Sequence, residues 1–156
     1  MHHQYPGRPP RLNVLYSGYQ PVFFLTFNTY KRQRILARDE IHEPFVSFCQ
    51  KAEAHAVRVG YYVIMPDHVH LFIWCDPSRA SLQAWVKAVK SYLSKCLLTL
   101  HVARPHWQEG FFDHLLRHAE SYHEKSAYVL MNPVRAGLCV RREDWPYSGK
   151  IADLAM

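Results

Sequence analysis

Residues 61–74, YYVIMPDHVHLFIW, form an apolar stretch that is interrupted once by turn-forming residues. Proline presets φ and aspartate tolerates a bend, so Met65-Pro66-Asp67 predicts a tight hairpin between strands at 61–64 and 68–74. Side chains on a strand alternate between its two faces. The pattern therefore predicts one strand face that carries two imidazoles, made of His68, His70, Phe72 and Trp74.

The two histidines have two possible interpretations. Residues two apart on a strand are separated by about 6.6–6.8 Å, and imidazoles can lean together across that gap to share a metal ion. The alternative is a half-buried strand whose histidines make ordinary hydrogen bonds. The chain has 11 histidines, so this spacing can arise by chance. The residues that lie near His68 and His70 therefore decide between the two interpretations.

The remainder of the chain alternates between strand patterns and helix patterns, the latter with apolar residues three or four positions apart. The order of elements is β-α-β-β-α-β-α, which is a split βαββαβ unit followed by one more helix. The other expected elements are a strand at 22–28, a helix from about 44 that stops at Gly60, a long helix after 76–78 with an apolar stripe from 82 to 100, a strand or hairpin near Gly110, and a helix at 117–131.

This order predicts an α+β fold of the ferredoxin-like class. Such a fold has a four-stranded antiparallel sheet with helices on one face, here with a C-terminal helix added. We expect residues 21–150 to form a single domain. Residues 1–20 are rich in proline, glycine and arginine and are expected to form an irregular basic arm.

Composition narrows the class of partner. Hydrophobic residues make up 49% of the 156 residues, which argues against disorder, and the formal net charge of +6 favours a polyanionic partner. The four cysteines are far apart and show no CxxC pairing, which fits a reducing cytosol better than a disulfide framework. No secretory signal and no apolar run of about 18 residues is present, so we expect a cytoplasmic location and no membrane partner.

Tyr128 and Asn132 supply a second group of polar side chains. They are four residues apart, so a helix places them on one face, and Pro133 is expected to leave Asn132 at the helix end with its amide oxygen free to turn. If this face packs over the histidine strand, the site holds two imidazoles, an amide oxygen and a phenol. Alternatively, Tyr128 packs a helix face and Asn132 caps a helix.

Such a donor set points to particular chemistry. Imidazole with oxygen ligands suits Mn²⁺, and Mg²⁺ accepts such sites when a substrate phosphate completes the coordination shell. A metal that polarises a phosphodiester makes its phosphorus more open to attack by a phenolate, which gives a phosphotyrosyl enzyme and a free hydroxyl. One phosphodiester replaces another, so the step is reversible. The residues therefore suit strand transfer better than hydrolysis.

Three segments together resemble a known family. The segment YYVIMPDHVHLFIW is similar to the His-hydrophobic-His segment of single-tyrosine HUH transposases. The segments HWQEGFFDHLLR and YVLMNPVRAGL resemble the REP-associated tyrosine transposases of that superfamily, and the resemblance runs from about Tyr19 to Trp145.

The resemblance implies roles for particular residues. His68 and His70 are then metal ligands for Mg²⁺ or Mn²⁺, and Tyr128 is the nucleophile that forms a 5′-phosphotyrosine link. Related insertion-sequence enzymes carry glutamine one turn after the tyrosine as third ligand, and this chain has the shorter Asn132 there. The implied partner is single-stranded DNA with a hairpin, bound by a monomer or a homodimer in the bacterial nucleoid.

Several basic residues are candidate phosphate contacts, although any one of them taken alone is more often a solvated charge. These candidates are Lys87, Lys90, Arg117, Lys125 and Arg135. Two other functions share the fold: a regulator that binds hairpin DNA without turnover, and a replication initiator with the same chemistry. The presence of both histidines and the tyrosine favours the enzyme over the regulator, and the NPVRAGL segment argues against the initiator.

Overall fold

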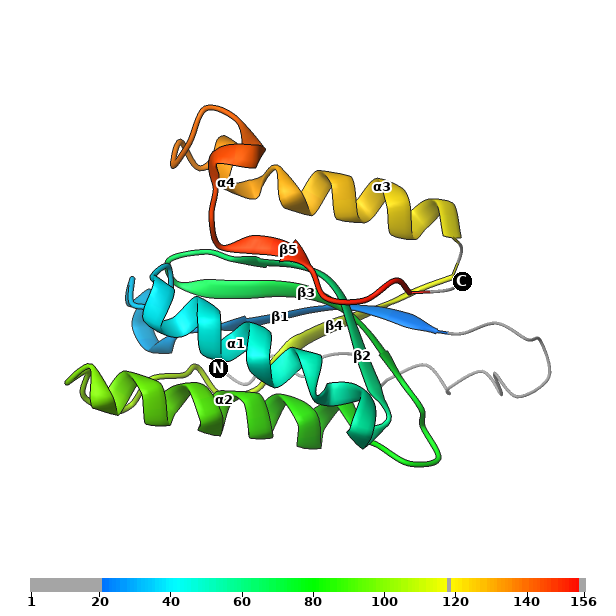
Figure 1. The fold of residues 1–156 in the computed structure, drawn as a ribbon, viewed down its shortest axis with the longest axis horizontal. Helices are drawn as coiled ribbons and strands as arrows, with labels where there is room; N and C mark the ends of the chain where they lie inside the picture. The colour runs from blue at the N-terminus through cyan, green and yellow to red at the C-terminus, as the bar shows by residue number, and fades with distance from the viewer. Residues whose placement is uncertain (1–20, 118, 155–156) are drawn as a thin grey trace, which may run out of the picture.

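The computed structural model describes residues 21–117 and 119–154, so the basic arm expected at 1–20 lies outside the described residues. Its centre is a five-stranded antiparallel sheet in the order β4-β1-β3-β2-β5 (Figure 1). The strands are β1 Val22–Asn28, β2 Val57–Ile64, β3 His68–Cys75, β4 Phe112–Leu116 and β5 Ser148–Lys150. The helices are α1 Asp39–Gln50, α2 Leu82–Thr99, α3 Ala119–Leu130 and α4 Asn132–Arg135, with 3₁₀ turns at Tyr30–Arg32, Ala52–His55 and Arg142–Asp144.

Helices α1 and α2 cover one face of the sheet (Figure 1). Val69, Leu71 and Ile73 of β3 are fully buried in the core beneath them, as the period-two pattern predicts. Helix α2 begins at Ser81, whose side chain accepts a hydrogen bond from the backbone N–H of Ala84. This layer forms the larger of the two cores.

Helix α3 lies over the opposite face of the sheet, the face that carries His68 and His70. A second, smaller core joins α3 to this face, and it includes Phe24 and Phe72 of the sheet and Tyr122, Val129 and Leu130 of the helix. The sheet therefore has a larger core on the face that α1 and α2 cover, and a smaller core on the histidine face that α3 covers (Figure 1).

The hairpin that carries the histidines is confirmed. Strands β2 and β3 pair antiparallel from Ile64 opposite Val69, and the backbone N–H of Met65 donates to the carbonyl of His68 at 2.8 Å. The adjoining loop is tied to the same turn, because the N–H groups of Ile35 and Leu36 both donate to the carbonyl of Pro66. His68 therefore starts β3 from a fixed position.

The predicted α+β class with an antiparallel sheet is confirmed, but the count of four strands was wrong. The fifth strand, β5, is only three residues long and pairs with the outer edge of β2. It contains Gly149 and a lysine, so it lacks the apolar or alternating pattern that marks a strand. The ferredoxin-like subtype stays a prediction.

Gly60 is not a helix stop, as the sequence suggested, but lies inside β2. The chain leaves α1 at Lys51 and turns at Ala56, which has a left-handed φ of 61°. The real need for glycine at position 60 is a close approach: an added Cβ would lie 2.5 Å from the hydroxyl oxygen of Tyr122 on α3. Its small size lets α3 approach the sheet.

The helix expected at 117–131 is present as α3, and a second short helix follows it directly. Pro133 was expected to force Asn132 out of helical geometry. Instead Asn132 is the first residue of α4, and proline is tolerated because the early N–H groups of a helix need no intrahelical partner. After α4, the indole of Trp145 donates to the carbonyl of Ile64 and guides the chain into β5.

No helix in the described part of the chain is both long enough and apolar enough to cross a bilayer.

Candidate active site

The two histidines of β3 point toward each other. Their Nε2 atoms lie 3.1 Å apart, and the ring centroids are separated by 4.6 Å. Both side chains are partly buried on the face that α3 covers. Strand alternation therefore brings two nitrogen donors to one point.

The outer nitrogen of His68 is held by the turn that precedes it. Its Nδ1 lies 2.7 Å from Oδ1 of Asp67, and a carboxylate can only accept, so Nδ1 carries the proton and Nε2 keeps its lone pair. Arg32 binds the other carboxylate oxygen of Asp67 at 2.9 Å. This chain of contacts fixes the orientation of the imidazole.

The outer nitrogen of His70 is held by a neighbouring strand. Thr26 is paired directly opposite His70 in the β1–β3 register, and its Oγ1 lies 2.7 Å from Nδ1 of His70. The ring of Phe24 stacks on the same imidazole, with centroids 5.3 Å apart. Both histidines thus have their Nδ1 atoms occupied and their Nε2 atoms directed at each other.

The surroundings keep both imidazoles neutral. Burial lowers the pKa of His70 to about 3, and the neighbouring His68 and the positive charges of Lys125, Arg32 and Arg135 act in the same direction. Burial also lowers the pKa of His68, although the Asp67 carboxylate opposes it. Neutral imidazole is the form that binds a metal.

The carboxyl group of Asp67 stays ionised. Burial pushes its pKa upward, but hydrogen bonds from Arg32 and His68 outweigh burial and hold the pKa below its usual range. An ionised Asp67 is the state that accepts the Nδ1 proton of His68.

The donor arrangement fits a divalent metal ion. Nitrogen ligands lie about 2.0–2.1 Å from a first-row metal, so two Nε2 atoms at the observed separation can contact one ion. Hydrogen bonds to the opposite ring nitrogens are the usual support for metal-binding histidines. Within residues 21–117 and 119–154, no group of three or more His, Cys, Asp or Glu side chains is placed to hold a metal ion.

Tyr128 is a largely exposed residue of α3. Its side chain is 61% exposed, and Cζ of the Arg135 guanidinium lies 3.8 Å from the centre of its ring. Lys125, one turn earlier on α3, has its Nζ 6.0 Å from the same ring and 4.9 Å from the ring of Phe24. Because Phe24 also stacks on His70, Lys125 links the tyrosine helix to the histidine face.

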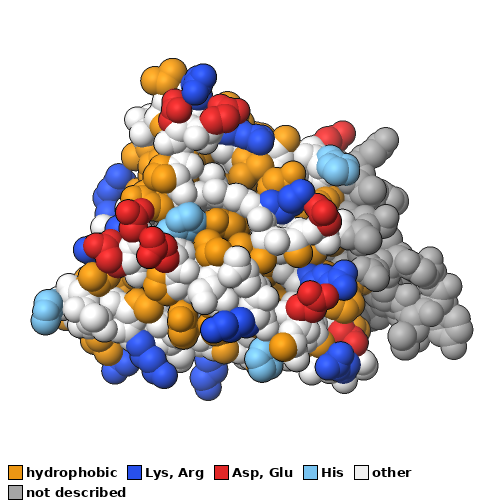
Figure 2. Space-filling model, in the orientation of Figure 1, with side chains coloured by type: hydrophobic (Ala, Val, Ile, Leu, Met, Phe, Trp, Pro, Cys, Tyr) orange, Lys and Arg blue, Asp and Glu red, His pale blue; other side chains and the backbone are white. Residues whose placement is uncertain are grey.

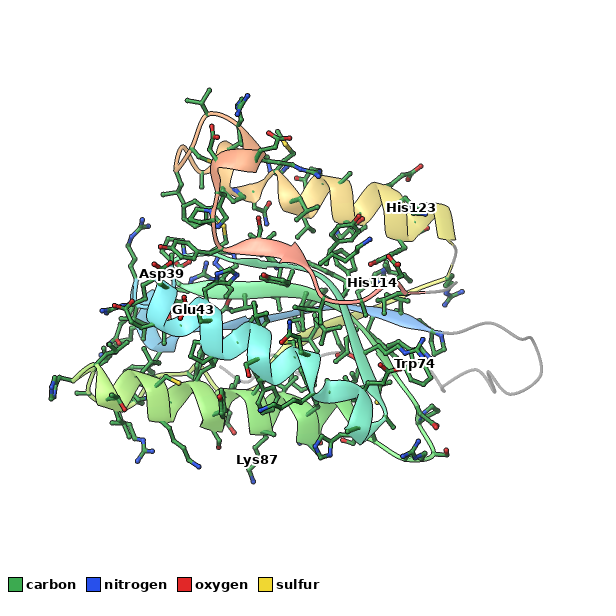
Figure 3. All side chains as sticks on the ribbon, in the orientation of Figure 1. Asp39, Glu43, Trp74, Lys87, His114 and His123 are labelled. Atoms are coloured by element: carbon green, nitrogen blue, oxygen red, sulfur yellow. The ribbon has the colours of Figure 1, made fainter. Side chains whose placement is uncertain are left out.

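A cavity of about 860 Å³ opens between the edge strand β4 and α3. Arg117 and Lys125 supply positive charge to its lining, and Tyr128 lies on its wall. Figure 3 shows His114, another lining residue, between the sheet and α3. Two of the five candidate phosphate contacts therefore share one cavity with the tyrosine. Glu124 also lines this cavity and forms no ion pair with another described residue.

Asn132 lies four residues after Tyr128, at the start of α4. Its Oδ1 accepts a hydrogen bond from Nη2 of Arg135. An amide oxygen has two lone pairs, so one remains for a further partner. The role of Asn132 as third ligand stays a prediction.

The structure does not bring Lys87 and Lys90 together with the histidines, because α2 covers the other face of the sheet. Figure 3 shows Lys87 pointing away from the sheet, and Figure 2 shows a row of Lys and Arg side chains along this lower edge. Lys90 instead donates to the carbonyls of Gln108 at 3.1 Å and Gly110 at 2.7 Å. It holds the loop before β4.

Comparison with known proteins identifies the family. A model of the IS200-like transposases matches residues 19–129, which is most of the chain. The chain belongs to this transposase family. The match spans both histidines and Tyr128 and stops just before Asn132.

Two similar proteins narrow the likeness within the IS200-like transposases. The REP-associated tyrosine transposase of Escherichia coli (strain K12) is 24% identical over 136 residues, which cover 86% of this chain and 79% of that protein. A solved structure of a REP-associated tyrosine transposase bound to a REP hairpin has a TM-score of 0.67 at 18% identity, and the match covers 88% of this chain and 92% of that chain. The resemblance to the REP-associated branch is confirmed.

Sequence reasoning missed the residues that orient the histidines of this IS200-like transposase. Asp67 was assigned only to the turn, and Thr26 only to a buried strand. The position of Asp67 directly before His68 was an available signal, since adjacent carboxylates often support metal-binding histidines. Thr26 gave no such signal, because its contact depends on the β1–β3 register across 44 residues.

Proposed function

We propose that this IS200-like transposase is a REP-associated tyrosine transposase that cuts and rejoins hairpin-forming single-stranded DNA through a 5′-phosphotyrosine. The observation that carries the proposal is the pair of Nε2 atoms 3.1 Å apart on the sheet face that the tyrosine helix covers. A solved relative of the same fold is bound to a REP hairpin, which supports hairpin DNA as the partner.

The cavity beside Tyr128 is the place for the strand to be cut. Arg117 and Lys125 line it together with Tyr128, so a phosphate that enters meets two positive charges next to the phenol. Such contacts position the backbone without reading its sequence. Recognition of the hairpin then fixes which phosphodiester reaches Tyr128.

His68 and His70 would hold a divalent metal ion, with Asn132 as a candidate third ligand, and the bound ion would supply charge stabilisation at the scissile phosphate. Asp67 and Thr26 orient the two imidazoles, and burial favours their neutral form. The buried position of His70 also keeps a competing proton away from its donor nitrogen.

Tyr128 acts as the nucleophile. Its phenolic oxygen bonds to phosphorus as the proton leaves to solvent, the bond from phosphorus to the 3′ oxygen breaks, and that oxygen takes up a proton. The products are a 5′-phosphotyrosine link and a free 3′-hydroxyl. Because one phosphodiester has replaced another, a second 3′-hydroxyl can reverse the step and join a new end.

A covalent-adduct assay tests this function. The protein is incubated with labelled oligonucleotides that carry palindromes from its own genomic flanks, with Mg²⁺, Mn²⁺ or chelator, and separated on a denaturing gel. We expect a metal-dependent adduct that Tyr128→Phe abolishes while hairpin binding persists. An adduct that survives in Tyr128→Phe would assign the nucleophile elsewhere.

The histidines need their own test. His68→Ala and His70→Ala should each remove both metal dependence and cleavage, and undiminished cleavage in either would contradict the metal assignment. Hairpin binding with no adduct under any of these conditions would favour the alternative, a regulator of the same fold that binds without turnover.

A further inference from the structure

Arg135 makes three contacts that all concern the tyrosine helix and its end. Its guanidinium lies over the Tyr128 ring, with Cζ 3.8 Å from the ring centre. Its Nη2 donates to the backbone carbonyl of Tyr128 at 2.7 Å and to Oδ1 of Asn132. One side chain thus binds the nucleophile twice and the candidate third ligand once.

These contacts occupy the groups that a phosphate would use. The Nη2 atom carries two N–H donors, and both have protein acceptors within hydrogen-bonding distance. The centre of the guanidinium also lies within cation–π distance of the Tyr128 ring. Arg135 is therefore poorly arranged for the bidentate phosphate contact that the sequence suggested.

The orientation of the Tyr128 ring depends on such contacts. Its side chain is mostly exposed, and no described residue makes a hydrogen bond to its hydroxyl. An exposed aromatic ring without a neighbour samples several rotamers. Contact with a cation over its face restricts the ring, and the backbone contact of the same guanidinium fixes where that cation lies.

We propose that Arg135 is a positioning residue, which holds the Tyr128 ring and the Asn132 amide in the orientation that the strand-transfer step needs, and that it is not a phosphate contact. The inference rests on the proposed function in one respect, since it takes Tyr128 as the nucleophile. It assigns Arg135 to the rate of the covalent step rather than to the affinity for DNA.

Arg135→Lys tests the assignment, because lysine keeps the charge but loses the planar fork and the stacking face. Two quantities are measured: hairpin affinity by fluorescence anisotropy, and the rate of adduct formation in a single turnover at saturating DNA. We expect the rate to fall by about 10–100-fold with Kd unchanged, because misplacement of a reacting group has costs of this size. Full retention of the rate, or a loss that appears in Kd and vanishes at saturation, would overturn the proposal.

Arg141→Lys is the matched control. Arg141 is an exposed arginine in the segment after α4, it pairs with Asp144, and it contacts no residue of the site. We expect it to leave both quantities unchanged. An equal loss of rate in Arg141→Lys would show that the effect of Arg135→Lys is not specific to its contacts.

Chemical nitration of Tyr128 separates this inference from the proposed function, because it requires neither DNA nor catalysis. The modified position is identified by peptide mass spectrometry. Loss of the covering guanidinium should make Tyr128 react faster in Arg135→Lys than in the wild type, even if the wild type forms no adduct at all. Equal nitration rates would overturn the holding role of Arg135.

Discussion

The hydroxyl of Thr26 lies 2.7 Å from Nδ1 of His70, because the register of β1 against β3 places the two residues directly opposite each other. The contact turns the other ring nitrogen toward His68. A donor orientation that the site requires is thus set by strand pairing and not by the loop around it.

Thr26→Val removes this hydroxyl while keeping the shape of the side chain. Metal affinity should fall by about 10–100-fold, which is the usual cost of losing such a support. Isothermal titration with Mn²⁺ measures it. Thr99→Val is the control. The hydroxyl of Thr99 also makes a hydrogen bond, to the carbonyl of Lys95, but Thr99 lies at the end of α2, away from the site. Unchanged affinity in Thr26→Val would mean that the hydroxyl does not orient His70.

Lys90 and Lys87 should differ in their contribution to the stability of the folded protein, although both were candidate phosphate contacts. Lys90→Met removes two hydrogen bonds from a charged donor to loop carbonyls, and the free energy of unfolding should fall by about 1–3 kcal/mol. Lys87→Met should leave it unchanged, because Lys87 is exposed and makes no such bond. Urea denaturation measures both, and equal midpoints for the two variants would contradict the structural role of Lys90.

Salt dependence separates the two faces of the sheet. Lys125 lines the cavity beside Tyr128, so Lys125→Ala should reduce the slope of log affinity against log salt concentration by about one. Lys87→Ala should leave the slope unchanged, because α2 covers the opposite face. Hairpin affinities measured over a range of salt concentrations provide the test. An equal reduction in both variants would place DNA on α2 as well.

Protonation of His42 should make the folded protein less stable in mild acid. His42 lies 2.8 Å from the hydroxyl of Tyr62, and burial lowers its pKa although Asp39 and Glu43 oppose this. In the unfolded chain the His42 imidazole therefore binds a proton near pH 6.5, whereas in the folded protein it binds one only at lower pH. The free energy of unfolding falls as the pH drops below about 6.5.

His42→Gln keeps a donor for Tyr62 but cannot titrate. Between about pH 7.5 and about pH 5.5, which spans the ordinary histidine pKa, the Tm of the wild type should fall more than that of His42→Gln. The remaining histidines are common to both proteins, so the difference isolates His42. Parallel decreases in Tm would contradict the expected titration of this group.

The histidine pair could be predicted from sequence because every signal for it is local. The turn at Met65–Asp67 sets where β3 begins, and alternation then places His68 and His70 on one face. The helix that carries Tyr128 was also found, since its pattern extends over several turns. That α3 packs over the same face was a supposition, and the smaller core confirms it.

What the sequence could not reveal depends on partners that are distant along the chain. β5 is too short to show a strand pattern in the sequence, and what defines it as a strand is its backbone pairing with the edge of β2. The position of Asn132 was misjudged because the rule that proline disfavours a preceding helical residue gives way where a new helix begins. Arg135 was predicted only as a phosphate contact, since nothing in the sequence shows that its guanidinium lies over the Tyr128 ring.

The glycine on β2 has a consequence for the spacing between the sheet and the helix that carries Tyr128. An added methyl group at Gly60 would lie 2.5 Å from the Tyr122 hydroxyl oxygen and 2.8 Å from Cδ1 of Leu154, so a side chain there requires both neighbours to move. Tyr122 lies on α3 six residues before Tyr128. A single position in the middle of a strand, outside the candidate site, therefore limits how closely the first turns of α3 can approach the sheet.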